Sequence, residues 1–211
     1  HLQIEEEKMS TEINIEEFCA PVIHPTTGKV ITKYEKIIKH PELRYTWETG
    51  FGKEFGSLCQ GDDRTGAKGT DTLHVMEPSD IPNIPKDRVV THGRIVIDYR
   101  PQKEDPNRVR ITAGGTLIDY PGELTTRTAD LTTSKIMWNS VLSTQWAKYM
   151  CVDINFFYLA APMDRYEYMK MTLSVFPQHI KDQYDLDRKA HKGFVYLEIR
   201  RMIYGLPQAG A

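Results

Sequence analysis

The residue with the clearest potential for chemistry is Asp153, which lies in the apolar run Tyr149–Ile154 (YMCVDI). An ionised carboxylate beside a buried strand is costly unless it binds a metal ion or pairs with a cation. Carboxylates at strand ends hold the two divalent ions of two-metal phosphoryl transfer, where one ion activates a hydroxyl and the other neutralises the leaving group. An aspartate that caps a strand or pairs with an arginine is the alternative. This segment alone leaves both interpretations open.

A second segment, RIVIDYRP, carries a row of charged side chains. Strand alternation puts Arg94, Val96, Asp98 and Arg100 on one face. An arginine guanidinium presents a planar fork of donors that suits phosphate groups. The alternative is a salt-bridged face exposed to solvent, with Asp98 as the structural partner of a nearby arginine.

A third segment, YGLPQAG, ends the chain with a sharp turn. Gly205 and Pro207 mark the turn, and the Gln208 amide can both donate and accept hydrogen bonds. Taken alone, the segment also fits any loop that opens a helix.

Basic side chains gather around the second of these segments. Residues 86–110 hold seven basic and four acidic residues, although the whole chain has a net charge of −2. Arg100 and Lys103 lie in the polar connection RPQKEDPN, and Arg108 and Arg110 follow it. These four residues are candidates for contacts with nucleic-acid phosphates. The alternative is a solvated hairpin tip.

The elements that would position these residues alternate between strand and helix patterns, which predicts an α+β fold in two lobes. We expect helices over 31–38, 45–58, 128–144 and 178–184. We expect a long-connected β-hairpin over 89–99 and 108–113, and further strands over 149–154, 167–173 and 194–200. The run 149–154 reads as a buried strand that ends at Asp153. Residues 61–69 are a loop by composition.

Composition limits the function classes. A net charge of −2 excludes a generic basic protein that coats nucleic acid. The three cysteines, Cys19, Cys59 and Cys151, lie far apart without metal-ligand spacing, so reduced, core or partly buried thiols in an intracellular protein are expected, in a cytoplasmic particle or the nucleus. No apolar run approaches the roughly 20 residues that span a bilayer, so no membrane partner is expected. The chain starts at His1 and ends in QAGA, so both ends are expected to be cut from a longer polypeptide.

In their order and separations, these segments resemble the fingers and palm of copia-type retrotransposon reverse transcriptases. The resemblance covers roughly residues 40–211 and includes Trp47 and Glu54 in TWETGFGKEFGSL, which look like the helix that begins that family's domain. Residues 1–40, with a polar stretch over 5–18, are expected to form a lead-in segment, poorly ordered at least in part. The resemblance implies a fingers lobe with a β-hairpin over 41–127. It also implies a partial palm, a mixed or antiparallel sheet with helices, over 128–211.

The resemblance also implies residue roles. Arg94 would bind the incoming triphosphate. Asp153 would be the first catalytic aspartate and a ligand of Mg²⁺, with the Ile154 backbone carbonyl as a secondary ligand. Tyr158 would be the aromatic steric gate that excludes a 2′-hydroxyl, and Gln208 would pack on the nascent base pair.

The implied function is RNA-directed DNA synthesis on a template–primer, from deoxynucleoside triphosphates, within a retrotransposon polyprotein. Further regions of such a polyprotein, RNase H and integrase, are candidate partners. Two departures matter. Asn155 and Phe156 stand where the family has a polar or basic pair, and the paired-Asp strand expected after Gln208 is absent from this chain, which ends at Ala211. The fragment alone is therefore expected to be inactive. A decayed or domesticated nucleic-acid-binding or interaction module is the alternative, and a viral RNA-dependent RNA polymerase palm is a third.

Overall fold

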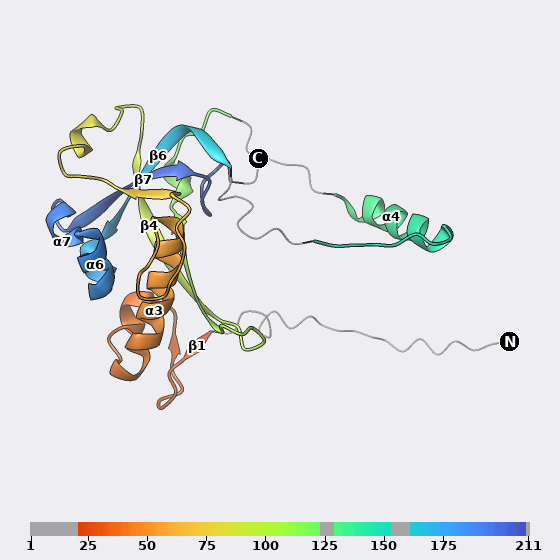
Figure 1. Ribbon diagram of the computed structural model, residues 1–211, viewed down its shortest axis with the longest axis horizontal. Coiled ribbons are helices and arrows are strands. Elements are labelled where there is room, and N and C mark those ends of the chain that lie inside the picture. Colours follow the sequence, from red (N-terminus) through yellow and green to blue (C-terminus); the bar gives the residue numbers. More distant parts are fainter. Residues whose placement is uncertain (1–20, 123–128, 153–160, 210–211) are drawn as a thin grey trace.

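The computed structural model describes residues 21–122, 129–152 and 161–209 (Figure 1). These residues form an α+β fold, as the sequence predicts. Its centre is a five-stranded mixed sheet in the order β3-β7-β6-β4-β5. The strands are β3 (Leu73–Val75), β4 (Val90–Tyr99), β5 (Asn107–Ala113), β6 (Pro162–Thr172) and β7 (Phe194–Arg201).

Four strand pairings hold this sheet together. β4 and β6 run parallel, whereas the pairs β3–β7, β6–β7 and β4–β5 are antiparallel. The parallel pair joins strands from either side of position 127, where the sequence places the division between fingers and palm. One continuous sheet therefore contains strands from both predicted regions, and the division itself stays a prediction.

The remaining elements are short except for two helices. A two-stranded sheet pairs β1 (Val22–Ile23) with β2 (Val30–Ile31). The α-helices are α2 (Tyr34–Ile37), α3 (Pro41–Leu58), α4 (Leu131–Ser143), α6 (Gln178–Tyr184) and α7 (Leu186–Lys189). Three 3₁₀ turns, η1 (Ile81–Asn83), η2 (Gly115–Leu117) and η3 (Leu173–Val175), complete the described elements.

The core lies between the sheet and α3, with α6 and α7 beside it (Figure 1). Trp47, Phe51 and Phe55 are buried on α3. The ring of Phe176, just after η3, makes edge contacts with Phe51 and Phe55 at centroid distances of 5.5 and 5.2 Å. These interlocked aromatic rings fix α3 against the sheet, because a helix buried along its aromatic side cannot slide without losing contact area.

Most predicted elements are confirmed. The structure contains the β4–β5 hairpin, α3, α4, α6, β6 and β7 at the expected places, and α3 begins four residues earlier than the predicted 45. The predicted helix over 31–38 is only partly correct, because Ile31 belongs to β2 and only Tyr34–Ile37 is helical. Residues 21–40, assigned to a lead-in segment, pack on the core through Val22, Ile31, Tyr34 and Ile37, which are all buried. The start of that segment, residues 1–20, lies outside the described residues.

The predicted buried strand over 149–154 is wrong for its described part. Residues 149–152 have no regular secondary structure, and Met150 and Val152 are 80% and 66% exposed. An apolar run becomes a buried strand only where a neighbouring strand pairs with it, and none of the described strands does. Cys151 is exposed there, whereas Cys59 is buried as expected.

Helix α4 forms as its apolar spacing predicts, yet it does not pack on the described core. The Asp130 carboxylate caps the helix by accepting a hydrogen bond from the Thr133 backbone N–H at 2.7 Å. Leu131, Trp138 and Leu142 are 69%, 56% and 86% exposed, and α4 lies apart from the sheet in Figure 1. Periodicity and capping thus determine the helix, whereas burial of its apolar side chains depends on a partner element.

Candidate nucleic-acid interface

The β4–β5 hairpin gathers arginines on one face. Its register pairs Val96 with Arg110 and Asp98 with Arg108, and directly paired residues project from the same side of a sheet. The opposite face carries Ile95 and Ile97, which pack against the core. We call Arg94, Arg100, Arg108 and Arg110 together the arginine face. The alternation predicted for 94–100 is therefore confirmed.

Arg94 stands apart from the other three arginines. It is exposed and has no hydrogen-bond or ion-pair partner among residues 21–122, 129–152 and 161–209. It lines a hollow of about 680 Å³ together with Lys33 and Glu35. This hollow lies where β4 continues past the end of its pairing with β6, at His92–Lys170. A free guanidinium beside a lysine suits an anionic ligand.

Arg100 and Arg108 share a crowded basic environment. Arg100 Nη2 lies 3.5 Å from Asp98 Oδ2, so the expected structural role of Asp98 is confirmed. Burial lowers the pKa of Arg108, and the guanidiniums of Arg110 and Arg100 lower it further. Together with Lys103, they line a hollow of about 450 Å³ between the hairpin tip and α3. The hairpin thus holds positive charge that its acidic residues, Asp98, Glu104 and Asp105, offset only in part.

Arg110 meets the YGLPQAG segment. Its guanidinium carbon lies 4.5 Å from the centre of the Tyr204 ring, and the Ala113 backbone N–H donates to the Tyr204 carbonyl at 2.8 Å. The sequence assigns Tyr204 no separate role, and only its place directly before the Gly205 turn could have drawn attention to it. A cation stacked on an aromatic ring keeps its edge donors available for a ligand.

Two unpartnered buried polar atoms lie where Arg110 meets this turn, and a third, Arg100 Nε, lies nearer the hairpin tip. Gln208 is 2% exposed, and its Oε1 has no hydrogen-bond partner within the described part of the chain. The same holds for Arg110 Nε. Buried polar atoms are nearly always paired in native proteins, so each of these atoms lacks a partner that the described residues do not supply.

A carboxyl group from α3 accepts a hydrogen bond from the free edge of β5. Glu54 Oε1 accepts a hydrogen bond from the Ile111 backbone N–H at 3.2 Å. Burial raises the pKa of Glu54, against the opposing effects of the Ile111 hydrogen bond and of Arg108 and Arg110. This contact caps an edge strand that would otherwise present a free N–H to another chain.

Glu54→Gln is expected to stabilise the fold at pH 7 by roughly 0.5–1 kcal/mol, because the amide keeps the acceptor for Ile111 without a buried charge. The raised pKa means that the carboxyl contributes most at acid pH and that this contribution is lost as pH rises through the folded-state pKa. The advantage of the variant should therefore shrink towards and below the ordinary glutamate pKa of 4.5. Thermal unfolding across a pH series measures it, and a difference independent of pH would contradict the assignment. Glu54→Ala is the control and should destabilise.

The remaining predicted site residues, Asp153, Ile154 and Tyr158, lie outside the described residues, so their roles stay predictions. Within the described ranges, the single group of histidine, cysteine and acidic side chains close enough to share a metal ion is His24, His40 and Glu42. Its two imidazoles do not suit Mg²⁺, which prefers oxygen ligands. Mg²⁺ therefore stays a prediction that rests on Asp153.

The described helices also give no sign of a membrane span, since none of them is both long and apolar enough to cross a bilayer. Comparison of the chain with protein-family models, with curated proteins and with solved structures found no match.

Proposed function

We propose that this chain forms the fingers and the first part of the palm of an RNA-directed DNA polymerase, which adds deoxynucleotides to a primer on an RNA or DNA template. The observation that carries the proposal is the arginine face, with the Gln208 turn seated at its end. Two segments that lie about a hundred residues apart in the sequence, and that the resemblance assigns to one site, meet here through Arg110 and Tyr204.

The charges of the arginine face support binding of a phosphate backbone. Arg100, Arg108 and Arg110 project from one face of the hairpin, and Lys103 lies at its tip. Phosphate contacts of this kind provide affinity and orientation without reading the base sequence. That is what a polymerase needs, because it must accept any template.

Arg94 and Gln208 would handle the incoming nucleotide. Arg94 has the unpaired fork of donors that a triphosphate requires, and its hollow also holds Lys33. Gln208 has a buried amide oxygen that lacks a donor. In the proposed enzyme Asp153, Ile154 and Tyr158 complete the site, Mg²⁺ supplies the charge neutralisation that phosphoryl transfer needs, and the protein works inside the cell, in a cytoplasmic particle or the nucleus.

Arg94→Ala is expected to abolish stabilisation of the template–primer complex by the complementary deoxynucleoside triphosphate, while template–primer affinity without nucleotide falls no more than about tenfold, the share of one phosphate contact. Fluorescence anisotropy of a labelled template–primer, with and without nucleotide, measures both quantities. Lys29→Ala, which removes one charge from the neighbouring turn, is the control and should keep the nucleotide effect. A wild-type chain that does not bind template–primer would overturn the proposal.

The arginine face also fits a second function, a nucleic-acid-binding module without catalysis. Such a module needs the phosphate contacts and does not need nucleotide binding at Arg94. It would therefore bind template–primer with no response to any nucleotide. Primer extension by a chain that continues past Ala211, in the presence of Mg²⁺, separates the two functions.

A further inference from the structure

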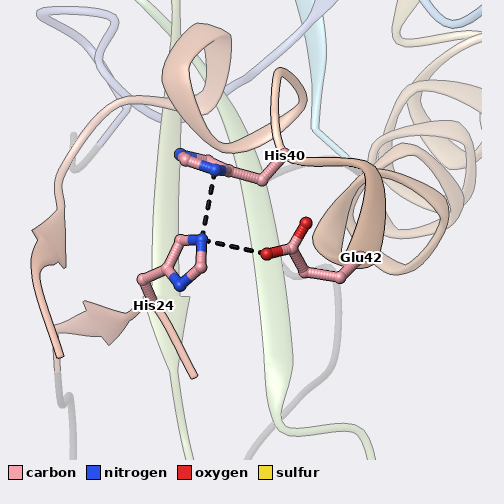
Figure 2. A group of neighbouring side chains, drawn as sticks. All are labelled: His24, His40 and Glu42. Carbon is pink, nitrogen blue, oxygen red and sulfur yellow. Dashed lines mark hydrogen bonds and ion pairs between the residues drawn. The ribbon is translucent and has the colours of Figure 1, made fainter. Parts of the chain in front are cut away.

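The β1–β2 hairpin and the start of α3 bring together His24, His40 and Glu42 (Figure 2). His24 Nε2 lies 3.1 Å from His40 Nδ1 and 3.0 Å from Glu42 Oε1. The three ligand atoms all lie within 4.8 Å of one another. The rings of the two histidines meet edge to face, with centroids 4.5 Å apart.

Local structure holds each of these side chains in place. His24 directly follows β1, at the start of a turn that Gly28 closes with a φ of +65°. His40 is the N-cap residue of α3, and Glu42 lies in the first turn of that helix. The His24 side chain is 7% exposed, whereas the Glu42 side chain is 45% exposed. The group is thus anchored on its buried side and open to water on the other.

Hydrogen bonding alone gives His24 Nε2 two neighbouring acceptors, His40 Nδ1 and Glu42 Oε1, for one proton. A neutral imidazole carries one N–H, so the single proton on His24 Nε2 must be shared between His40 and Glu42. A divalent cation accepts a lone pair from all three side chains at once. We propose that His24, His40 and Glu42 form a binding site for a borderline divalent cation such as Zn²⁺, with the fourth position taken by water.

The geometry and the donor types fit such an ion. Zinc binds imidazole nitrogens at about 2.0–2.1 Å, so two ligand atoms of a tetrahedral site lie about 3.3 Å apart. The two short separations in the group, 3.1 and 3.0 Å, need to widen by only a few tenths of an ångström. Two imidazoles and one carboxylate favour Zn²⁺, Co²⁺ or Ni²⁺ over Mg²⁺ and Ca²⁺. The inference is therefore independent of the polymerase proposal and of its magnesium.

Binding would change the turn that carries His24. The backbone N–H groups of Thr26 and Thr27 donate to His24 Nδ1 at 3.2 and 3.3 Å. Metal at Nε2 places the remaining ring proton on Nδ1, so Nδ1 can no longer accept these bonds. The positive N-terminal end of α3 also opposes a cation, and Glu42 offsets it. The amides of Thr26 and Thr27 should consequently report on metal binding.

The test is a titration of the 211-residue chain with Co²⁺ and Zn²⁺ at neutral pH. We expect a single equivalent of Co²⁺ to give the intense visible absorption of a four-coordinate ion, Zn²⁺ to displace it, and the Thr26 and Thr27 amide signals to shift. His40→Gln and Glu42→Gln should each weaken binding by at least about tenfold. Both side chains lie at the partly open side of the group, so these variants keep the fold.

The matched control is His92→Gln, which removes an exposed histidine on β4 and should leave metal affinity unchanged. Two results would overturn the proposal: a wild-type chain that does not bind Zn²⁺ at a hundredfold excess, or binding that both variants retain in full. Either result would make the group a hydrogen-bonded latch between the β1–β2 hairpin and α3. Circular dichroism of each variant confirms that the comparison is made between folded proteins.

Discussion

Gly205→Ala is expected to destabilise the fold by about 3 kcal/mol or more, because two penalties add at this position. The backbone of Gly205 has a φ of +92°, which an alanine adopts only with strain. An added Cβ would also lie 2.1 Å from the Ala113 carbonyl oxygen, which belongs to the sheet and cannot move aside cheaply. Denaturant unfolding followed by circular dichroism measures the loss.

Gly193→Ala separates the two penalties. Gly193 also has a positive φ, +78°, yet no atom lies within 4 Å of the position its Cβ would occupy. Its substitution should cost only the backbone strain, about 1 kcal/mol. Gly115→Ala tests the close approach from the other side, since its Cβ would lie 2.0 Å from the Gly205 carbonyl oxygen. Equal losses at Gly205 and Gly193 would show that the backbone crossing is unimportant.

This crossing matters for the candidate site because it fixes the turn that carries Tyr204 and Gln208. The turn touches the end of β5 backbone to backbone, with the Ala113 N–H bonded to the Tyr204 carbonyl. A side chain at either glycine would push the turn away from Arg110. If Gly205→Ala still folds, it should therefore also lose template–primer affinity.

Arg108→Ala combined with Arg110→Ala is expected to weaken template–primer binding about 100-fold near 0.1 M salt. Each phosphate contact contributes about tenfold at this salt concentration through release of counterions. The slope of log affinity against log salt should fall in magnitude by about 2. Anisotropy titrations over a salt series give both numbers. The same fall should appear for templates of unrelated sequence, because phosphate contacts do not read bases.

The control for this double variant removes two positive charges elsewhere. Arg188 and Lys189 on α7 form ion pairs with Glu77, away from the hairpin. Replacing both with alanine changes the net charge by the same amount, and exposed ion pairs add little stability. A comparable loss of affinity in this control would attribute binding to overall charge and refute the role of the arginine face.

Local sequence patterns predicted the hairpin, α3, α4 and α6 because their causes act over a few residues. Alternating β-branched residues favour β4 and β5, and helical spacing with Asp130 as a cap favours α4. Long-range packing could not be predicted in this way. The short strand β3 and the parallel pairing of β4 with β6 depend on contacts between distant segments.

The segment 149–152 shows that local patterns can also predict packing that does not occur. Its apolar residues fit a buried strand, yet Met150 and Val152 are exposed. Residues 21–40, in contrast, contribute Tyr34 and Ile37 to the core. Hydrophobicity tells which side chains gain from burial, and only the presence of a partner surface decides whether they are buried.

The sequence by itself determined that Arg94 and Arg100 share one face of their strand and that Arg108 and Arg110 share one face of theirs, because the side-chain period of a strand is a property of the chain. Only the tertiary structure decided that these two pairs share the same face of the hairpin and that Arg110 lies over Tyr204. It also brought His24 to His40 and Glu42. Such meetings depend on the free energy of the whole packed core, which no local pattern contains.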